Sequence, residues 1–261
     1  MHLHKNTSLK ELEKERSSEP ILAGGNDMRD ASGLTETLYI ATEWIMRFSV
    51  INIFWFVLNI PVFFTISSIF LGDSESGALI YLLPLVILLP GLFFPSTAAM
   101  FATVREWILK KDQSSLTKAY FSHLKDNYRK SFASGLVLMA IWLVWIVDFT
   151  FVKNGIDLLR TAFAVIGLIL FVFTINFLSL GAHYQMQNKA LMRNAFFITV
   201  GNPLLSLFIL FSNFSLFYVS ATELLFLLPL FAGTISAFLS FLAFYRFTLK
   251  VEKKALDSKE I

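Results

Sequence analysis

Long apolar runs separated by short polar segments dominate the chain between residues 34 and 249. Six of these runs are long enough to cross the core of a bilayer, which takes about 20 helical residues. They cover approximately residues 45–71, 78–104, 132–151, 161–181, 198–219 and 224–247. The pattern therefore predicts an all-α fold, a polytopic transmembrane helix bundle of about six spans within a membrane domain at residues 34–249.

Polar segments flank this domain. Residues 1–33 are rich in charge and contain few apolar side chains, which predicts a disordered N-terminal tail, with a partner-binding arm as the alternative. Residues 250–261 form a second charged tail.

The second span contains an unusual concentration of prolines. Apolar character continues from residue 78 to residue 109, longer than one straight crossing requires. Because proline removes a backbone donor and clashes with the preceding turn, we expect the helix to be interrupted between Pro90 and Pro95. It should restart at Ser96–Thr97 with Ser96 as the N-cap, packed inside the bundle because lipid cannot satisfy broken backbone. Three small residues follow that allow close helix approach: Ala98, Ala99 and Ala102.

Residues 113–130 combine aromatic and apolar residues at helical spacing with lysines and arginines. This pattern predicts an amphipathic helix that lies in the membrane interface.

The charge distribution predicts the orientation. All 22 Lys and Arg residues except Lys153 and Arg160 fall on one side of a six-span arrangement, in the N-terminal segment, the loops after the second and fourth spans, and the C-terminal tail. The positive-inside rule assigns that side to the cytoplasm, with both termini there.

Composition agrees with the membrane class. Hydrophobic residues make up 56% of the chain and charged residues 16%, against about 45–50% and 25% in soluble domains. The absence of cysteine excludes disulfides and thiolate sites, and the four histidines show no metal-binding spacing. No phosphate loop, zinc-protease or nucleophile-elbow motif occurs, so we expect no catalytic, cofactor-binding or metal-binding residues and no enzyme activity. The basic residues follow from topology, so nucleic-acid binding is not expected.

Polar residues inside the spans are the first candidates for function. Asn52 and Asn59 lie seven residues apart and share one helix face, and Asn176, Ser179 and His183 form a stripe on the fourth span. Two explanations remain open for both groups. They could line a path for a solute or proton, or they could form hydrogen bonds between helices worth about 0.6 kcal/mol each.

Arg105 and Trp107 end the second span. Residues of these types favour the membrane surface, where they act as anchors, and ligand contacts are the alternative.

Three stretches together resemble one protein family. They are residues 43–48 (Glu-Trp-Ile-Met-Arg-Phe) continuing through Asn52 and Trp55, residues 94–107 (Phe-Pro-Ser-Thr-Ala-Ala-Met-Phe-Ala-Thr-Val-Arg-Glu-Trp), and residues 120–131 with their aromatics, lysines and Asn127. They resemble the YesL-like family of bacterial membrane proteins, which is defined by sequence and has no established activity. The resemblance implies a bacterial cell-membrane protein with an accessory role in carbohydrate uptake, and hence a carbohydrate transporter or another membrane subunit as partner.

Two functions therefore stand as hypotheses. The first is a non-enzymatic accessory or partner-binding protein embedded in the lipid bilayer, which the resemblance and the basic segment 105–130 favour. The second is a small-solute transporter with a site at Pro95, Ser96 and Thr97, because interrupted helices often build binding sites.

Overall fold

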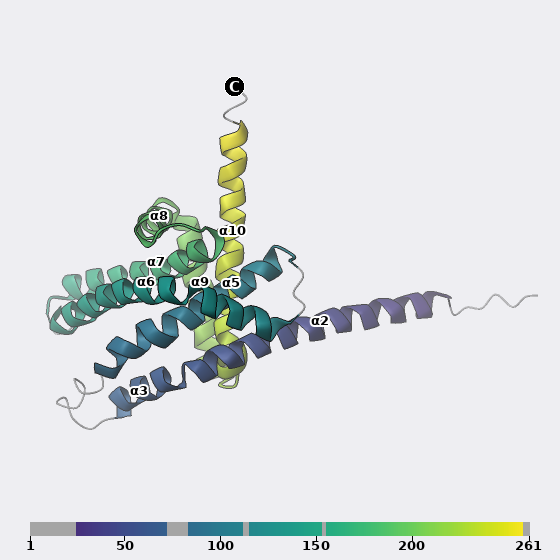
Figure 1. Ribbon diagram of the computed structural model, residues 1–261, viewed down its shortest axis with the longest axis horizontal. Coiled ribbons are helices and arrows are strands. Elements are labelled where there is room, and N and C mark those ends of the chain that lie inside the picture. Colours follow the sequence, from purple (N-terminus) through teal and green to yellow (C-terminus); the bar gives the residue numbers. More distant parts are fainter. Residues whose placement is uncertain (1–24, 72–82, 112–114, 153–154, 258–261) are drawn as a thin grey trace, which may run out of the picture. The chain divides into compact units, whose positions relative to one another are not determined.

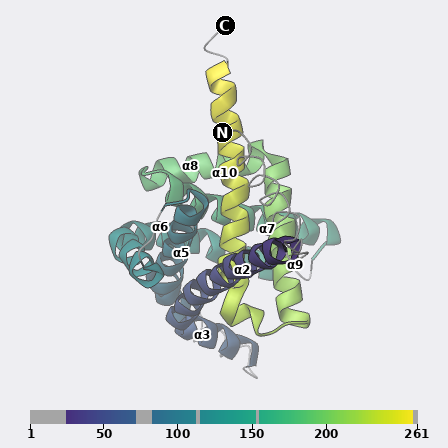
Figure 2. The same cartoon turned by 90° about the vertical axis from the view of Figure 1, so that its right-hand side faces the viewer.

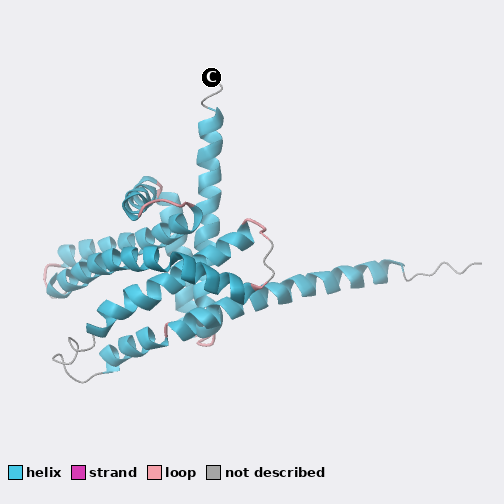
Figure 3. Cartoon of the chain, in the orientation of Figure 1, coloured by secondary structure: helices cyan, strands magenta, loops and turns pink. Residues whose placement is uncertain are grey.

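The computed structural model describes residues 25–71, 83–111, 115–152 and 155–257, and these contain helices and no strand (Figures 1 and 3). The elements are α2 (Gly25–Leu58), α3 (Ile60–Leu71), η1 (Leu89–Phe93), α5 (Phe94–Ile108), α6 (Leu116–Val152), α7 (Asp157–His183), α8 (Asn188–Gly201), α9 (Pro203–Thr222), η2 (Leu228–Ala232) and α10 (Gly233–Asp257). The segments η1 and η2 are single π-helical turns.

Within these residues, six helical segments are long and apolar enough to cross a membrane. They are Thr35–Leu58, Leu83–Ile108, Leu116–Val152, Asp157–His183, Pro203–Thr222 and Leu228–Lys254. The predicted all-α bundle of six spans is confirmed, and the protein is a multi-pass membrane protein.

The chain divides into two compact units, residues 1–45 and residues 46–261. In the first unit α2 already begins at Gly25, although residues 25–33 were expected to belong to the polar tail. Elongating an existing helix is far easier than nucleating one, so the apolar segment can carry helix into its polar flank. Residues 1–24 of the predicted tail lie outside the described part of the chain.

In the second unit, α5 packs against α6, α7 and α10, and α10 also packs against α9 (Figure 2). Almost every residue from Phe94 to Val104 is buried. The helix that ends the predicted second span is therefore the core of this unit.

The expected interruption between Pro90 and Pro95 is wrong in its form. The chain stays helical from residue 83 to residue 108 and accommodates the prolines in the π turn η1. The Phe94 N–H bonds to the carbonyl of Leu89, five residues back. Pro95 has no N–H for the carbonyl of Gly91, and the hydroxyl of Tyr128 on α6 donates to that oxygen instead, at 3.1 Å. A neighbouring helix thus replaces the missing hydrogen bond, and the expectation that this stretch packs inside the bundle is confirmed.

Ser96 is not an N-cap. It lies inside α5, which begins at Phe94, and its hydroxyl donates back to the carbonyls of Leu92 at 2.6 Å and Phe93 at 3.1 Å. A serine in the helix interior can make this bond to the preceding turn, and here it helps to satisfy the carbonyls of the π turn.

The segment expected to be a separate interfacial helix is the first part of α6. This helix has 37 residues and is about 55 Å long, far longer than a bilayer core is thick. Its N-terminal part packs against α5. Tyr120 is fully buried there, and its hydroxyl donates to the carbonyl of Ser96 at 3.2 Å.

Two other spans are interrupted, each close to a proline in the sequence. The first breaks at Asn59, between α2 and α3, and the fifth breaks at Asn202, which precedes Pro203. A residue before proline is disfavoured in helical conformation, which explains the second break. The sixth span contains the second π turn, η2, which begins with Leu-Pro as η1 does.

Candidate functional site

Asn52 on α2 holds the π turn of the sixth span. Its amide N–H groups donate to the carbonyls of Leu228 at 3.0 Å and Pro229 at 2.8 Å. Its Oδ1 accepts from the backbone N–H of Thr234 at 2.9 Å and from the Thr234 hydroxyl at 3.3 Å. Thr234 lies where the π turn η2 passes into α10 without a break in the helix. Asn52 therefore joins α2 to this transition in the sixth span, and both ends of its side chain are satisfied.

Trp55, on the next turn of α2, and Asn59, just after the end of α2, bind the start of α5. The indole N–H of Trp55 donates to Oγ1 of Thr97 at 2.9 Å, and the Asn59 amide donates to Oγ of Ser96 at 2.8 Å. Thr97 in turn donates to the carbonyl of Phe93 at 2.6 Å. Both hydroxyls thus connect α2 to the π turn η1.

The contact between α2 and the sixth span is tight. A Cβ atom added to Gly233 would lie 2.9 Å from Oδ1 of Asn52 and 3.1 Å from the Trp55 ring. The candidates Asn52, Asn59, Ser96 and Thr97 are all at most 6% exposed, and Pro95 beside them is buried. These residues come together as a closed set of contacts between helices.

The stripe on α7 divides between two neighbours. Asn176 is fully buried and donates to Oγ1 of Thr199 on α8 at 2.9 Å. Ser179 is fully buried and its hydroxyl has no hydrogen-bond partner among the residues that the structure describes. The His183 ring lies 6.0 Å from Phe241 and 5.6 Å from Tyr245 on α10, measured between ring centroids.

Tyr184 follows α7 and also contacts α10. Its hydroxyl donates to Oε1 of Glu252 at 3.3 Å. Burial and the negative charge of Glu252 raise the pKa of Tyr184, so the hydroxyl stays protonated and remains a donor.

Trp107 is buried, in contrast to the surface anchor that the sequence suggested. It is 4% exposed, and its ring packs edge-on against Phe48 at 5.9 Å between centroids. The two candidates at the end of α5 therefore differ in their surroundings: Trp107 packs against protein, whereas Arg105 lines a cavity.

This cavity has a volume of about 780 Å³. Its walls come from α5, α6, α7, the loop after α7 and α8: Phe94, Ala98, Ala102, Arg105, His123, Asn127, Lys130, Ser131, Ser134, Phe177, Leu178, Gly181, Ala182, Gln185, Met186, Gln187, Asn188 and Leu191. The volume falls within the range of small-molecule sites, about 300–1,000 Å³.

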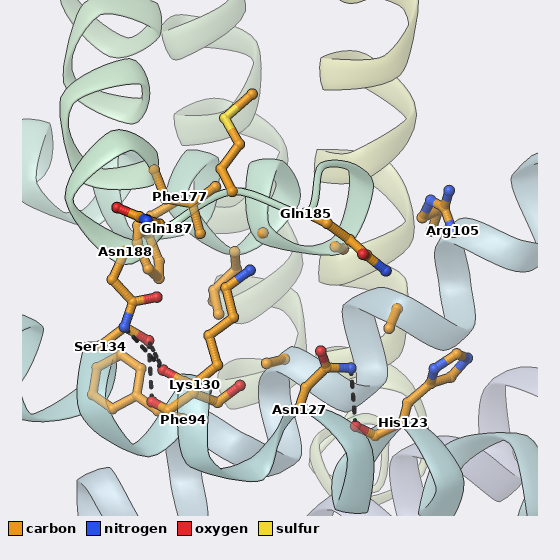
Figure 4. A pocket seen from close by; sticks show the side chains of 18 residues that line it. Phe94, Arg105, His123, Asn127, Lys130, Ser134, Phe177, Gln185, Gln187 and Asn188 are labelled. Atoms are coloured by element: carbon orange, nitrogen blue, oxygen red, sulfur yellow. Dashed lines mark hydrogen bonds between the residues drawn. The ribbon is translucent and has the colours of Figure 1, made fainter.

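Polar side chains converge on the cavity from three elements. Figure 4 shows Lys130 extending into the space that Asn127, Gln185 and Asn188 surround. The Asn188 amide donates to the carbonyl of Lys130 at 3.3 Å, which fixes the loop against α6. Three buried atoms of the lining have no hydrogen-bond partner among the described residues: Nε of Arg105, Nε2 of His123 and Oδ1 of Asn188. Nε2 of His123 faces the carboxylate of Glu106, so the donor of Arg105 and the acceptor of Asn188 remain available.

The charge of the lining is one-sided. Arg105 and Lys130 line the cavity, as does His123, and no Asp or Glu does. His123 lies 3.2 Å from the carboxylate of Glu106, which is outside the lining. Among the residues described, no three His, Asp or Glu side chains group closely enough to hold a metal ion.

Most of this lining was missed from the sequence, although a signal existed. His123, Asn127, Lys130 and Ser134 are spaced by four, three and four residues, which places them on one helix face. Gln185 and Asn188 gave no comparable signal, because only the packing of the α7–α8 loop brings them to α6.

Comparisons with known proteins find a matching family model and uncharacterized relatives. Residues 48–149 match the sequence model of a family described as "Protein of unknown function, DUF624". The chain is 24% identical to "Uncharacterized protein YteU" of Bacillus subtilis (strain 168) over 214 residues, 81% of this chain and 85% of that protein. It is 22% identical to "Uncharacterized protein YesL" of the same organism over 165 residues, 63% of this chain and 67% of that protein. The resemblance to the YesL-like family is therefore confirmed. No solved structure matches.

The segment that matches the DUF624 model, residues 48–149, contains only part of the residues described above. It contains Asn52, Asn59 and the π turn η1, as well as the α5 and α6 walls of the cavity with Arg105 and Lys130. The α7 and α8 walls and η2 lie beyond it. The chain thus completes its cavity with residues outside the matched segment.

Proposed function

We propose that this protein is a non-enzymatic accessory or partner-binding protein of a bacterial cell membrane, with both termini and the cavity on the cytoplasmic side. The observation that carries the proposal is the closed contact between α2 and the two π turns. A transporter with its site at the interrupted second span would need polar groups free to meet a solute there. Instead, Asn52, Trp55 and Asn59 donate their side-chain N–H groups to neighbouring protein groups. Oδ1 of Asn59 has no partner among the described residues, but Asn59 is fully buried, so this oxygen is closed to a solute.

The basic segment supplies a surface for a partner. Five of its cationic side chains are exposed: Lys110, Lys111, Lys118, Lys125 and Arg129. A cluster of exposed positive charge attracts acidic protein surfaces and speeds their association. The family resemblance implies a carbohydrate transporter as the partner, and this stays a prediction.

Affinity capture from native membranes tests the proposal. The tagged full chain should enrich a membrane partner, identified by mass spectrometry, relative to a membrane protein of similar size. A variant with Lys118→Gln, Lys125→Gln and Arg129→Gln should enrich it less, because these exposed residues supply the charge. Capture of no partner above the control, from membranes in which the tagged chain is folded, would contradict the accessory role.

A small-solute transporter remains the second candidate, favoured by the 780 Å³ cavity between α5, α6 and α7. The two functions differ in access, because a transporter must expose its site to both sides of the membrane in turn. Labelling a cavity residue from each side of the membrane separates the two functions.

A further inference from the structure

Two of the seven cationic side chains in the basic segment 105–130 line the cavity, and the other five do not. Lys110, Lys111, Lys118, Lys125 and Arg129 are exposed, as expected for charges that only set topology. Arg105 and Lys130 are half-buried and line the cavity. The positive-inside rule explains why positive charge lies at this end of the helices. It does not explain why these two side chains turn inward.

Neither inward cation has an acidic partner among the described residues. No ion pair forms at Arg105 or Lys130, and the cavity lining contains no carboxylate. Removing a cation from water without a counter-charge costs free energy, even when the removal is partial. A bound anion would supply the missing charge, and the partnerless Nε of Arg105 is a donor suited to it.

The remaining polar lining indicates more than a simple anion. Four amide side chains (Asn127, Gln185, Gln187 and Asn188) and two serines (Ser131 and Ser134) face the same space. Each amide offers both donors and an acceptor, the pattern that recognises hydroxyl groups. The volume of about 780 Å³ leaves room for a ligand much larger than inorganic phosphate.

We propose that the cavity binds a phosphorylated polyol, with Arg105 and Lys130 contacting the phosphate-bearing part and the amides contacting the hydroxyls. The same chemistry occurs in a soluble sugar phosphate and in the head group of an anionic glycerol phospholipid. This inference goes beyond the proposed accessory role and does not depend on any partner.

Binding measurements on the purified full chain in phosphatidylcholine nanodiscs test the inference. The soluble probes are glucose 6-phosphate, glucose and inorganic phosphate, titrated calorimetrically. The lipid probe is phosphatidylglycerol, added to the nanodiscs and followed by the shift in thermal stability. We expect glucose 6-phosphate to bind more tightly than either glucose or phosphate, or phosphatidylglycerol to stabilise the protein.

Matched variants assign the effect to the cavity. Arg105→Gln and Lys130→Gln should each weaken binding about ten- to hundredfold, the loss expected for one charge-assisted hydrogen bond. Arg129→Gln and Lys125→Gln remove the same charges from exposed positions and should leave affinity unchanged within about twofold. Arg105→Lys should restore part of the binding, which separates loss of charge from loss of fold.

The outcomes are distinct. Binding of glucose 6-phosphate that disappears in both cavity variants supports the proposal with a soluble ligand. Stabilisation by phosphatidylglycerol alone, lost in the same variants, supports it with a lipid. Failure of both probes, or equal losses in the cavity variants and the exposed controls, would overturn the proposal while leaving a partner found by affinity capture unaffected.

Discussion

Two faces of α5 use polar residues in opposite ways. On one face, Ser96 and Thr97 meet Asn59 and Trp55 of α2 in short hydrogen bonds within buried surroundings. On another face, Ala98, Ala102 and Arg105 border a cavity in which a cation and several amides face open space. Polar groups within membrane spans are expected to be functional by default. The two faces differ in how their polar groups are partnered: Asn52 makes four hydrogen bonds, whereas Nε of Arg105 has no partner among the described residues. Oδ1 of Asn59 also lacks a partner there, but Asn59 is fully buried, whereas Arg105 lines the cavity.

The largest effect should follow removal of the Asn52 side chain. Asn52→Ala removes the hydrogen bonds to the Thr234 N–H and to two carbonyls inside the bundle, and we expect a loss of about 3 kcal/mol in the free energy of unfolding. Denaturant unfolding in detergent measures it. Asn127→Ala is the matched control from the cavity, because Asn127 is exposed and donates only to a carbonyl of its own helix. Equal losses in the two variants would remove the distinction between the two faces.

A smaller contrast separates the two π turns. In Gly233→Ala the new methyl group would collide with Asn52 and Trp55, and we expect a loss of about 1–3 kcal/mol. Gly91 lies in η1, and a Cβ there would meet nothing within 4 Å. Gly91→Ala should therefore stabilise the protein by about 0.4–1 kcal/mol, because alanine restricts the unfolded chain. Thermal unfolding of both variants measures the difference, and a Gly233→Ala variant as stable as the parent would show that the contact is loose.

The smallest effect concerns one hydrogen bond at η1. Trp55→Phe keeps an aromatic ring but removes the indole N–H that donates to Thr97. A double-mutant cycle with Thr97→Val should give a coupling free energy of about 0.6 kcal/mol, the average for hydrogen bonds between membrane helices. A coupling of zero would mean that the bond contributes no stability.

Hydropathy and charge predicted the class of fold because the bilayer permits few alternatives. Only fully hydrogen-bonded helices can present apolar side chains to lipid over such lengths, so apolar runs identify the spans. The conformation around Pro90 and Pro95 could not be predicted in the same way. A proline can break a helix or can be accommodated by a π turn, depending on which group donates a hydrogen bond to the carbonyl that the proline leaves unpaired. Here the hydroxyl of Tyr128, 37 residues away in the sequence, donates to the carbonyl of Gly91.

The candidate residues show the same limit. Asn52 and Asn59 were found because a shared helix face is visible in the sequence, but their partners Thr234 and Ser96 lie on other spans. Trp107 was expected at the surface because residue type alone suggested it, and packing against Phe48 buried it instead. Arg105 was a candidate from the sequence, but the cavity that it lines could not be predicted. That cavity depends on the position of the loop between α7 and α8, which the sequence does not reveal.

The proposed function requires that the cavity open to the cytoplasmic side alone, while the neighbouring helix contacts stay closed. Cysteine labelling tests it directly, since the chain contains no cysteine of its own. Ala98 lines the cavity, and the next residue, Ala99, is 1% exposed, so Ala98→Cys and Ala99→Cys form a matched pair. A membrane-impermeant maleimide should label Ala98→Cys in inside-out vesicles and spare it in right-side-out vesicles. It should leave Ala99→Cys unlabelled in both until the protein is denatured. Labelling of Ala98→Cys from both sides, or equal labelling of Ala99→Cys, would contradict the account.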